Sequence, residues 1–184
     1  LDPQQRLMLQ TAWHTLEDAG YAGDRLSGSK TGVYIGICNN EYVHKLQGEV
    51  GRFSSHVASG NTPSAIANRI SYCFNLQGPS LAVDTACSSS LVAVYQACQS
   101  LQSGECHLAL AGGVNLMLSP ATTIALCRLH ALAPDGRCKS FGAAADGVGW
   151  SEGCGIVVLK RLSDARRNGD RILALALDLA ERYQ

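Results

Sequence analysis

Two spacings of apolar residues alternate along the chain, one typical of helices and the other of strands. The segment after Asp2 and Pro3 carries apolar residues three or four positions apart: Leu9, Ala12, Trp13, Leu16 and Ala19. This repeat predicts an amphipathic helix, with Asp2 as its N-cap and Pro3 in its first turn. Gly20 predicts where the helix ends.

Five short segments predict β-strands because they are almost uniformly apolar and are bounded by glycine, proline or polar residues. They cover residues 31–38, 80–84, 106–111, 155–159 and 172–177. Residues 39–60, by contrast, are polar and predict an irregular surface segment.

Helical repeats lie between these strands. They begin at Pro63, directly after Cys87, at Pro120 and at Ser163. The repeat after Cys87 predicts one apolar face: Leu91, Val94, Cys98 and Leu101. Apolar strands that alternate with helices predict an α/β fold with a buried, mostly parallel sheet covered by helices.

Composition narrows the function classes. The 184 residues are 46% hydrophobic and 16% charged, which fits one domain or a large piece of one. The formal net charge is zero, so no basic field favours nucleic acid or an anionic membrane. No apolar run is long enough to span a membrane, and no signal peptide opens the chain, so we expect a cytoplasmic protein. The chain also lacks an initial Met, as expected of a piece of a longer polypeptide.

The eight cysteines do not form a recognisable disulfide or zinc pattern. They lie at positions 38, 73, 87, 98, 106, 127, 138 and 154, with no C-x-x-C pair among them. In a chain of this length with an apolar core, we expect free, buried thiols and no metal site.

Cys87 is the candidate nucleophile. A strand leads through small residues to Cys87, which stands at the entry of a helix. The first N–H groups of a helix are unpaired, so they favour a thiolate and can stabilise an oxyanion, as covalent acyl transfer requires. The same spacing fits a buried structural cysteine with capping serines, and it also occurs in glutaminases and redox enzymes. Spacing alone leaves these alternatives open.

Residues 84–90, Asp-Thr-Ala-Cys-Ser-Ser-Ser, resemble the active-site motif of β-ketoacyl synthase domains in modular polyketide synthases and related fatty-acid synthases. Further segments match the same family in the same order: residues 1–7, 67–72, 109–114, 135–141, 144–147 and 159–165. The resemblance covers nearly the whole chain, and residues 1–184 are therefore expected to be the N-terminal part of a ketosynthase domain.

The resemblance implies a thiolase-like fold of two similar α/β halves, each with a five-stranded sheet. It implies homodimers, with the strand before the nucleophile near the two-fold axis. It also implies an acyl carrier protein as partner, and neighbouring acyltransferase and carrier domains in a longer polypeptide.

The implied reaction has two stages and no bound cofactor. Cys87 first accepts an acyl chain from the phosphopantetheine thioester of the carrier protein. A malonyl-type extender is then decarboxylated, and its carbanion attacks the acyl-Cys87 in polyketide or fatty-acid biosynthesis. The backbone N–H of Cys87 supplies half of the oxyanion hole.

The chain departs from the family in ways that limit this expectation. Two histidines assist condensation in the family, the first within a His-Gly-Thr-Gly-Thr-like motif that this sequence lacks. Its five histidines lie elsewhere, at positions 14, 44, 56, 107 and 130. Residues 175–184 diverge from the family, and Gly142 replaces a frequent Asp. The isolated chain is therefore expected to be unstable and inactive for the full reaction.

Two alternatives remain beside the ketosynthase. One is a non-catalytic, ketosynthase-like interaction module, against which the presence of Cys87 argues. The other is a thiolase or chalcone-synthase-like enzyme that acts on free coenzyme A esters, although the motifs at 84–90 and 144–147 fit the carrier-dependent group better.

Overall fold

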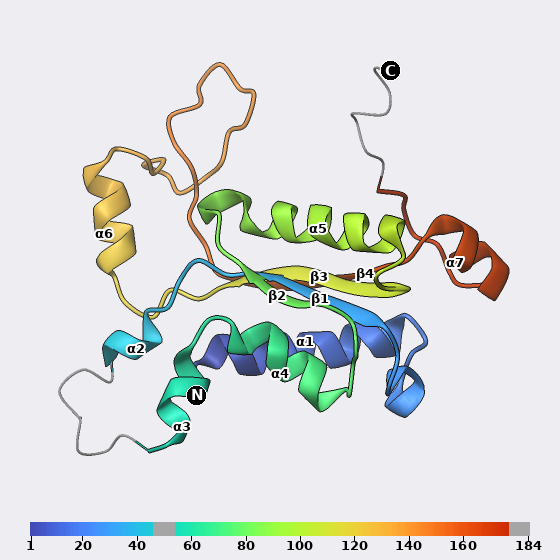
Figure 1. Cartoon of the computed structure of the whole chain (residues 1–184). Coiled ribbons are helices and arrows are strands. Elements are labelled where there is room, and N and C mark those ends of the chain that lie inside the picture. The colour runs from blue at the N-terminus through green and yellow to red at the C-terminus, as the bar shows by residue number, and fades with distance from the viewer. Residues whose placement is uncertain (46–53, 177–184) are drawn as a thin grey trace.

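A single sheet organises the structure, a computed structural model that describes residues 1–45 and 54–176. Its four strands in these ranges are β1 (Thr31–Gly36), β2 (Ser80–Val83), β3 (Leu108–Asn115) and β4 (Gly153–Leu159). Their order is β2-β1-β3-β4 (Figure 1). Strand β1 runs parallel to β2 and β3, and only β4 runs antiparallel to its neighbour, so the predicted mostly parallel sheet is confirmed.

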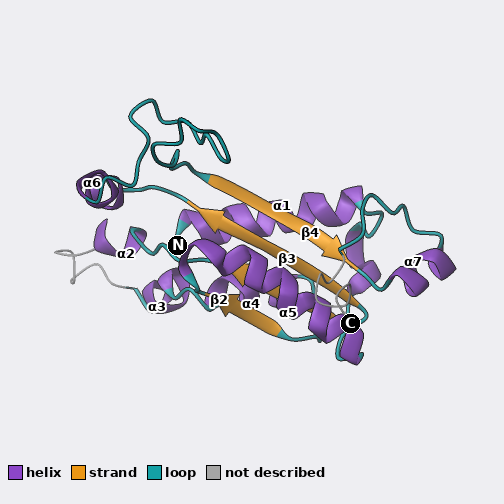
Figure 2. Cartoon of the chain, turned by 90° about the horizontal axis from the view of Figure 1, so that it is seen from above, coloured by secondary structure: helices purple, strands orange, loops and turns teal. Residues whose placement is uncertain are grey.

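Helices cover both faces of the sheet. Helices α1 (Pro3–Asp18) and α4 (Ala65–Cys73) pack on one face, and α5 (Ser89–Ser103) lies along the other (Figures 1 and 2). The shorter helices are η1 (Gly23–Leu26), α2 (Tyr42–Lys45), α3 (His56–Asn61), η3 (Ala86–Ser88), α6 (Ala121–Arg128) and α7 (Leu162–Asn168). In the described ranges, no helix combines the length and the apolar character needed to cross a membrane.

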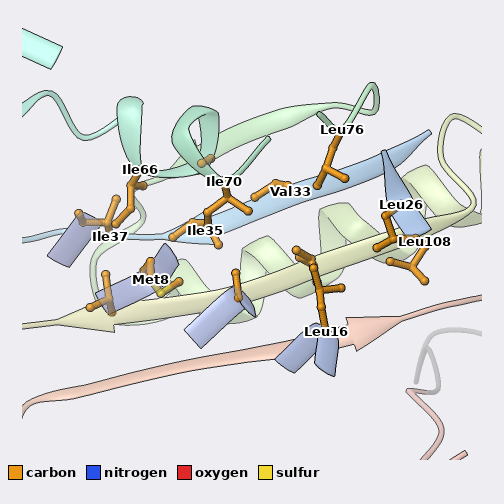
Figure 3. Packing of buried hydrophobic residues seen from close by; sticks show 14 residues of the cluster. Met8, Leu16, Leu26, Val33, Ile35, Ile37, Ile66, Ile70, Leu76 and Leu108 are labelled. Carbon is orange, nitrogen blue, oxygen red and sulfur yellow. The ribbon is translucent and has the colours of Figure 1, made fainter. Parts of the chain in front are cut away.

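Helix α1 begins as its first residues predict. The Asp2 carboxylate accepts a hydrogen bond from the Gln4 N–H at 2.8 Å, and Pro3 occupies the first turn. The helix buries Met8, Ala12 and Leu16 against the sheet, where they join the larger of the two apolar clusters (Figure 3).

Helix α5 buries small residues, which corrects the predicted apolar face. Ala93 and Ala97 are fully buried against the sheet, whereas Leu91 is 73% exposed. The sheet beneath them contributes the bulky ring of Tyr34, itself buried beside these alanines. Leu101 is buried in the same cluster and Val94 packs against it, so the predicted face is correct there and wrong at Leu91; the closest approach to the sheet is made by the small residues Ala93 and Ala97.

Two further expectations are wrong. Residues 172–176 form no strand, and Leu173 and Leu175 are largely exposed; residue 177 lies outside the described residues. These residues show no pairing to either edge of the sheet, which β2 and β4 occupy. The predicted irregular segment 39–60 contains helices α2 and α3 in its described part, while residues 46–53 lie outside it.

Candidate active site at the start of helix α5

Three parallel strands end at the same edge of the sheet, and the segments that follow them meet there. These segments begin with Ile37 after β1, Asp84 after β2 and Leu116 after β3. The Ile37 N–H donates to the Val83 carbonyl at 3.0 Å, which holds the first two segments side by side. In open α/β sheets, this carboxyl edge is where ligands bind. Helices α2 and α6 and the first turn of α5 lie at this end of the molecule (Figure 1).

Cys87 lies at this edge, in a sharp bend between β2 and α5. The bend is the short helix η3, and Cys87 is exposed within it. Ala86, directly before it, has a φ of 55°, in the left-handed region that costs an L-residue about 1–2 kcal/mol. Within the described residues, the Cys87 N–H donates no hydrogen bond to another protein group. The bend thus presents both a thiol and an unpaired N–H group.

Side-chain hydrogen bonds hold the bend. The Ser89 hydroxyl accepts from the Thr85 N–H at 2.9 Å and donates to the Ala86 carbonyl at 2.6 Å. The Asp84 carboxylate accepts from the Ala86 N–H at 3.1 Å. Ser88 occupies the N-cap position of α5, but its side chain makes no capping hydrogen bond. Its hydroxyl lies 2.8 Å from the Thr85 carbonyl instead. The serines therefore stabilise the bend before the helix, rather than cap the helix itself.

Two glycines let the first turn of α5 approach the sheet. A Cβ atom added to Gly36 would lie 2.6 Å from the backbone nitrogen of Ser90, and one added to Gly113 would lie 3.0 Å from the Ser90 Cβ. No side chain fits between the sheet and the helix at these positions. The glycines at the ends of β1 and β3 therefore fix the depth at which the bend that contains Cys87 lies.

A second thiol, Cys38, lies close to the bend. Burial raises the pKa of the Cys38 thiol, and the negative charges of Asp84 and of the Cys87 thiolate raise it further. Near neutral pH, Cys38 is therefore kept in its protonated, weakly nucleophilic form. The sequence motifs did not single out Cys38; its position just after a parallel strand was the signal that could have found it.

Glu41 connects this edge to the segment before α6. Its carboxylate accepts from the N–H groups of Leu118 and Ser119, both at 2.8 Å, and from the Thr122 hydroxyl at 2.7 Å. Burial raises the pKa of the Glu41 carboxyl, but these donors outweigh burial and leave its pKa below the ordinary value. Glu41 was also missed in the sequence. It fixes the segment that contains Met117 and Leu118, which lies at the same edge as Cys87.

His107 and His14 lie away from Cys87, whereas His44 belongs to α2, at the same end of the molecule as the bend (Figure 1). His107 precedes β3 at the opposite edge of the sheet, where its ring contacts Arg161. His14 is on the outer face of α1 beside Glu17, and His130 follows α6.

None of the eight cysteines forms a disulfide in the described structure, and, contrary to the expectation, most of them are not buried. Only Cys106 is fully buried, and five are exposed: Cys38, Cys73, Cys87, Cys127 and Cys138. No group of three or more His, Cys, Asp or Glu side chains in residues 1–45 and 54–176 is placed to hold a metal ion.

A hollow of about 320 Å³ lies between α1 and the end of α4, on the face of the sheet away from α5.

A strand, a tight bend with an exposed cysteine, and a helix packed on a mostly parallel sheet define an α/β protein with a candidate nucleophile, Cys87, at a helix start. Residues 1–165 match the family model of the β-ketoacyl synthase N-terminal domain. The chain belongs to this family.

Individual relatives of the chain are polyketide synthases, in agreement with the family match. The chain is 50% identical over 175 residues to the polyketide synthase GfsA of Streptomyces halstedii. It is also 50% identical over 175 residues to the spectinabilin polyketide synthase system protein NorC of Streptomyces orinoci. Each match covers 95% of this chain, but only 2% and 8%, respectively, of these relatives.

Solved structures confirm the thiolase-like ketosynthase fold. The ketosynthase from module 6 of the bacillaene synthase of Bacillus subtilis 168 matches with a TM-score of 0.83 and 44% identity, over 93% of this chain and 29% of that one. The oxazolomycin ketosynthase domain OzmH KS7 of Streptomyces albus JA3453 matches with a TM-score of 0.81 and 43% identity, over 94% of this chain and 30% of that one.

Proposed function

We propose that this chain supplies the nucleophile-bearing part of a β-ketoacyl synthase in a modular polyketide synthase, with Cys87 as the acyl acceptor. The observation that carries this proposal is the bend itself. It exposes the Cys87 thiol and leaves the Cys87 N–H unpaired at the start of α5. A nucleophile and an oxyanion donor on the same residue suit acyl transfer between thioesters.

In the first stage, the Cys87 thiolate attacks the carbonyl carbon of an acyl thioester on the phosphopantetheine of a carrier protein. The carbonyl oxygen becomes an oxyanion, which the Cys87 N–H stabilises. The carbon–sulfur bond to the carrier then breaks, the carrier thiol leaves, and the acyl chain remains on Cys87. The raised pKa of the neighbouring Cys38 thiol reduces the fraction that is present as the reactive thiolate.

In the second stage, a malonyl-type extender on the carrier protein loses carbon dioxide. The resulting carbanion attacks the carbonyl of acyl-Cys87, and the Cys87 thiolate leaves as the new carbon–carbon bond forms. The family's catalytic histidines for this stage belong to a motif that this sequence lacks, so these residues alone are proposed to perform only the first stage.

Partners follow from the same proposal. The carrier protein delivers both substrates, and acyltransferase and carrier domains act beside the ketosynthase in the same polypeptide. The outer edge of β2 has no strand neighbour in the described residues, and Leu81 on that strand is 44% exposed. This open edge next to the nucleophile bend supports a homodimer with its two-fold axis near β2.

The acyl-enzyme provides a direct test. The chain is incubated with the hexanoyl thioester of N-acetylcysteamine, and its intact mass and peptide masses are measured. We expect one hexanoyl group on Cys87. Cys87→Ala abolishes it, whereas Cys73→Ala, which removes an exposed thiol on the α1 and α4 side of the sheet, retains it.

The alternative is a non-catalytic interaction module. A folded chain that gains no hexanoyl group, or gains it equally on the exposed cysteines, would support this alternative. Competition between hexanoyl-coenzyme A and a hexanoyl carrier protein separates the carrier-dependent ketosynthase from an enzyme that uses free coenzyme A esters.

A further inference from the structure

The Ser89 hydroxyl uses both of its hydrogen-bonding functions to hold the nucleophile bend together. It accepts from the Thr85 N–H at 2.9 Å and donates to the Ala86 carbonyl at 2.6 Å. Ser89 is only 5% exposed, so water does not readily replace either partner. A buried hydroxyl that is satisfied on both sides acts as a fixed bridge across the bend.

The Ala86 carbonyl accepts from the Ser89 hydroxyl and also from the Ser89 backbone N–H, and the hydroxyl bond further fixes the position of the next amide. A trans peptide is planar, and its C=O and N–H groups point in opposite directions. The peptide that joins Ala86 to Cys87 is trans, since the described chain contains no cis peptide bond. When Ser89 holds the Ala86 carbonyl on one side, the Cys87 N–H must therefore point to the other side, away from Ser89.

Ala86 needs this support. Its φ of 55° is unfavourable for an L-residue, so the bend is expected to relax when its hydrogen bonds are lost. Ser89 is anchored independently, because its backbone is packed against Gly36 at the end of β1. The strained residue is thus held by one that the sheet keeps in place.

We propose that Ser89 is a positioning residue of the acyl-transfer site, which orients the Cys87 N–H as the oxyanion donor through the Ala86–Cys87 peptide. This inference rests on the proposed role of Cys87 as the acyl acceptor. Ser89 does not touch the substrate; it holds the peptide plane that does. Removal of its hydroxyl impairs the step that needs an oxyanion donor more than a step that needs only the thiol.

Two reactions of Cys87 separate these effects. Acylation by the hexanoyl thioester of N-acetylcysteamine passes through an oxyanion, whereas alkylation by iodoacetamide does not. Both rates are measured at Cys87 in the full chain by peptide mass spectrometry. We expect Ser89→Ala to lower the ratio of acylation to alkylation by about tenfold or more. Ser89→Thr, which keeps the hydroxyl, retains most of the parent ratio.

The matched control is Ser103→Ala, at the other end of the same helix. Among the described residues, the Ser103 hydroxyl donates to the Ser100 carbonyl within α5 and makes no hydrogen bond to the bend, so its loss leaves the ratio unchanged. Circular dichroism establishes that each variant is folded. A folded Ser89→Ala variant with the parent ratio would overturn the proposal.

Amide hydrogen exchange decides the proposal without any acylation. In the unmodified chain, we expect the Thr85 amide to exchange at least about tenfold more slowly than the unpaired Cys87 amide, since Ser89 accepts its hydrogen bond. Ser89→Ala removes this protection, and Ser103→Ala does not.

The two proposals can fail separately. If the chain gains no hexanoyl group, the proposed acyl transfer fails for this chain, and the exchange of the Thr85 amide alone decides the role of Ser89. If Thr85 and Cys87 exchange equally fast in the unmodified chain, Ser89 does not hold the bend, whatever the acylation result.

Discussion

At the scale of single residues, the candidate site distinguishes two neighbouring thiols by their surroundings. The thiols of Cys38 and Cys87 are both exposed, but partial desolvation of Cys38 and the negative charge of Asp84 raise the pKa of the Cys38 thiol. A raised pKa means that less thiolate is present at a given pH, and the thiolate is the reacting form. The negative charge of Asp84 thus lowers the reactivity of the Cys38 thiol. The same carboxylate accepts a hydrogen bond from the Ala86 N–H in the bend that presents Cys87.

This difference predicts how Cys38 reacts with iodoacetamide. Because its folded pKa lies above the ordinary value for a thiol, its alkylation rate should rise at a higher pH than that of a free cysteine. Asp84→Asn removes a negative charge, which lowers the pKa of Cys38, and should speed its alkylation at pH 8 about threefold. Asn keeps the oxygen that accepts from the Ala86 N–H. Peptide mass spectrometry over pH 6–10 measures the rates.

Asp146→Asn provides the control for this prediction. It removes an equal charge from a carboxylate that pairs with Lys139 and has no part in the pKa of Cys38. The idea would be refuted by a Cys38 profile that matches a free cysteine, or by equal effects of the two substitutions.

At the scale of elements, the position of α5 depends on the small residues beneath and within it. Gly36 and Gly113 form the surface under its first turn, and Ala93 and Ala97 form its buried face. The depth of the helix above the sheet sets the position of the bend that begins it. The glycines at the strand ends therefore belong to the site as much as to the core.

We expect Gly36→Ala to displace the start of α5. The added methyl would lie 2.6 Å from the Ser90 backbone nitrogen, so backbone has to move. Overpacking of this kind costs about 1–3 kcal/mol of unfolding free energy. Urea denaturation measures this cost, and acylation of Cys87 should fall in parallel.

Gly153→Ala is the matched glycine control, because an added Cβ there meets nothing within 4 Å. Its unfolding free energy should stay within about 1 kcal/mol of the parent. Equal urea midpoints for Gly36→Ala and Gly153→Ala would contradict the close approach of helix and sheet.

Local signals predicted some of these elements and not others. The N-terminus of α1 was predictable because Asp2 and Pro3 act within the first turn. The buried face of α5 was predicted only in part, at Leu101 and Val94, because burial of Ala93 and Ala97 depends on the sheet under the helix. Residues 172–176 have the composition of a strand, but a strand also needs a neighbour, and sequence alone does not show whether an edge is available.

The candidate site also combines features that the sequence predicted with features that it did not. The position of Cys87 between a strand and a helix follows from local sequence. The roles of Ser89 and Glu41 do not, because each depends on which backbone groups the folded chain brings to its side chain. Segments 38–41 and 116–122 come together only through the parallel pairing of β1 with β3.

At the scale of the whole molecule, α5 presents a second, outward apolar face. Leu91 is 73% exposed and Tyr95 58% exposed, one turn apart on the helix. Apolar side chains that face water in this way usually mark a surface that another unit covers. In the proposed ketosynthase, this unit is the second α/β half of the thiolase-like domain, and the chain by itself leaves the face open.

Self-association of the isolated chain is the consequence. We expect residues 1–184 alone to form oligomers at micromolar concentration and to unfold over a broad temperature range. The double substitution Leu91→Glu with Tyr95→Lys should shift the chain toward monomer in analytical ultracentrifugation. It should change the unfolding free energy by only about 0.5 kcal/mol, since neither side chain is buried.

A second double substitution on the same helix isolates the apolar contribution. Gln99→Glu with Gln102→Lys adds the same two charges at exposed polar positions, so it removes no apolar surface and should leave the oligomers unchanged. If both double variants dissolve the oligomers, added charge rather than the loss of Leu91 and Tyr95 is responsible. If the unmodified chain is monodisperse and unfolds in one sharp transition, the outward face of α5 needs no cover, and the chain folds as an independent unit.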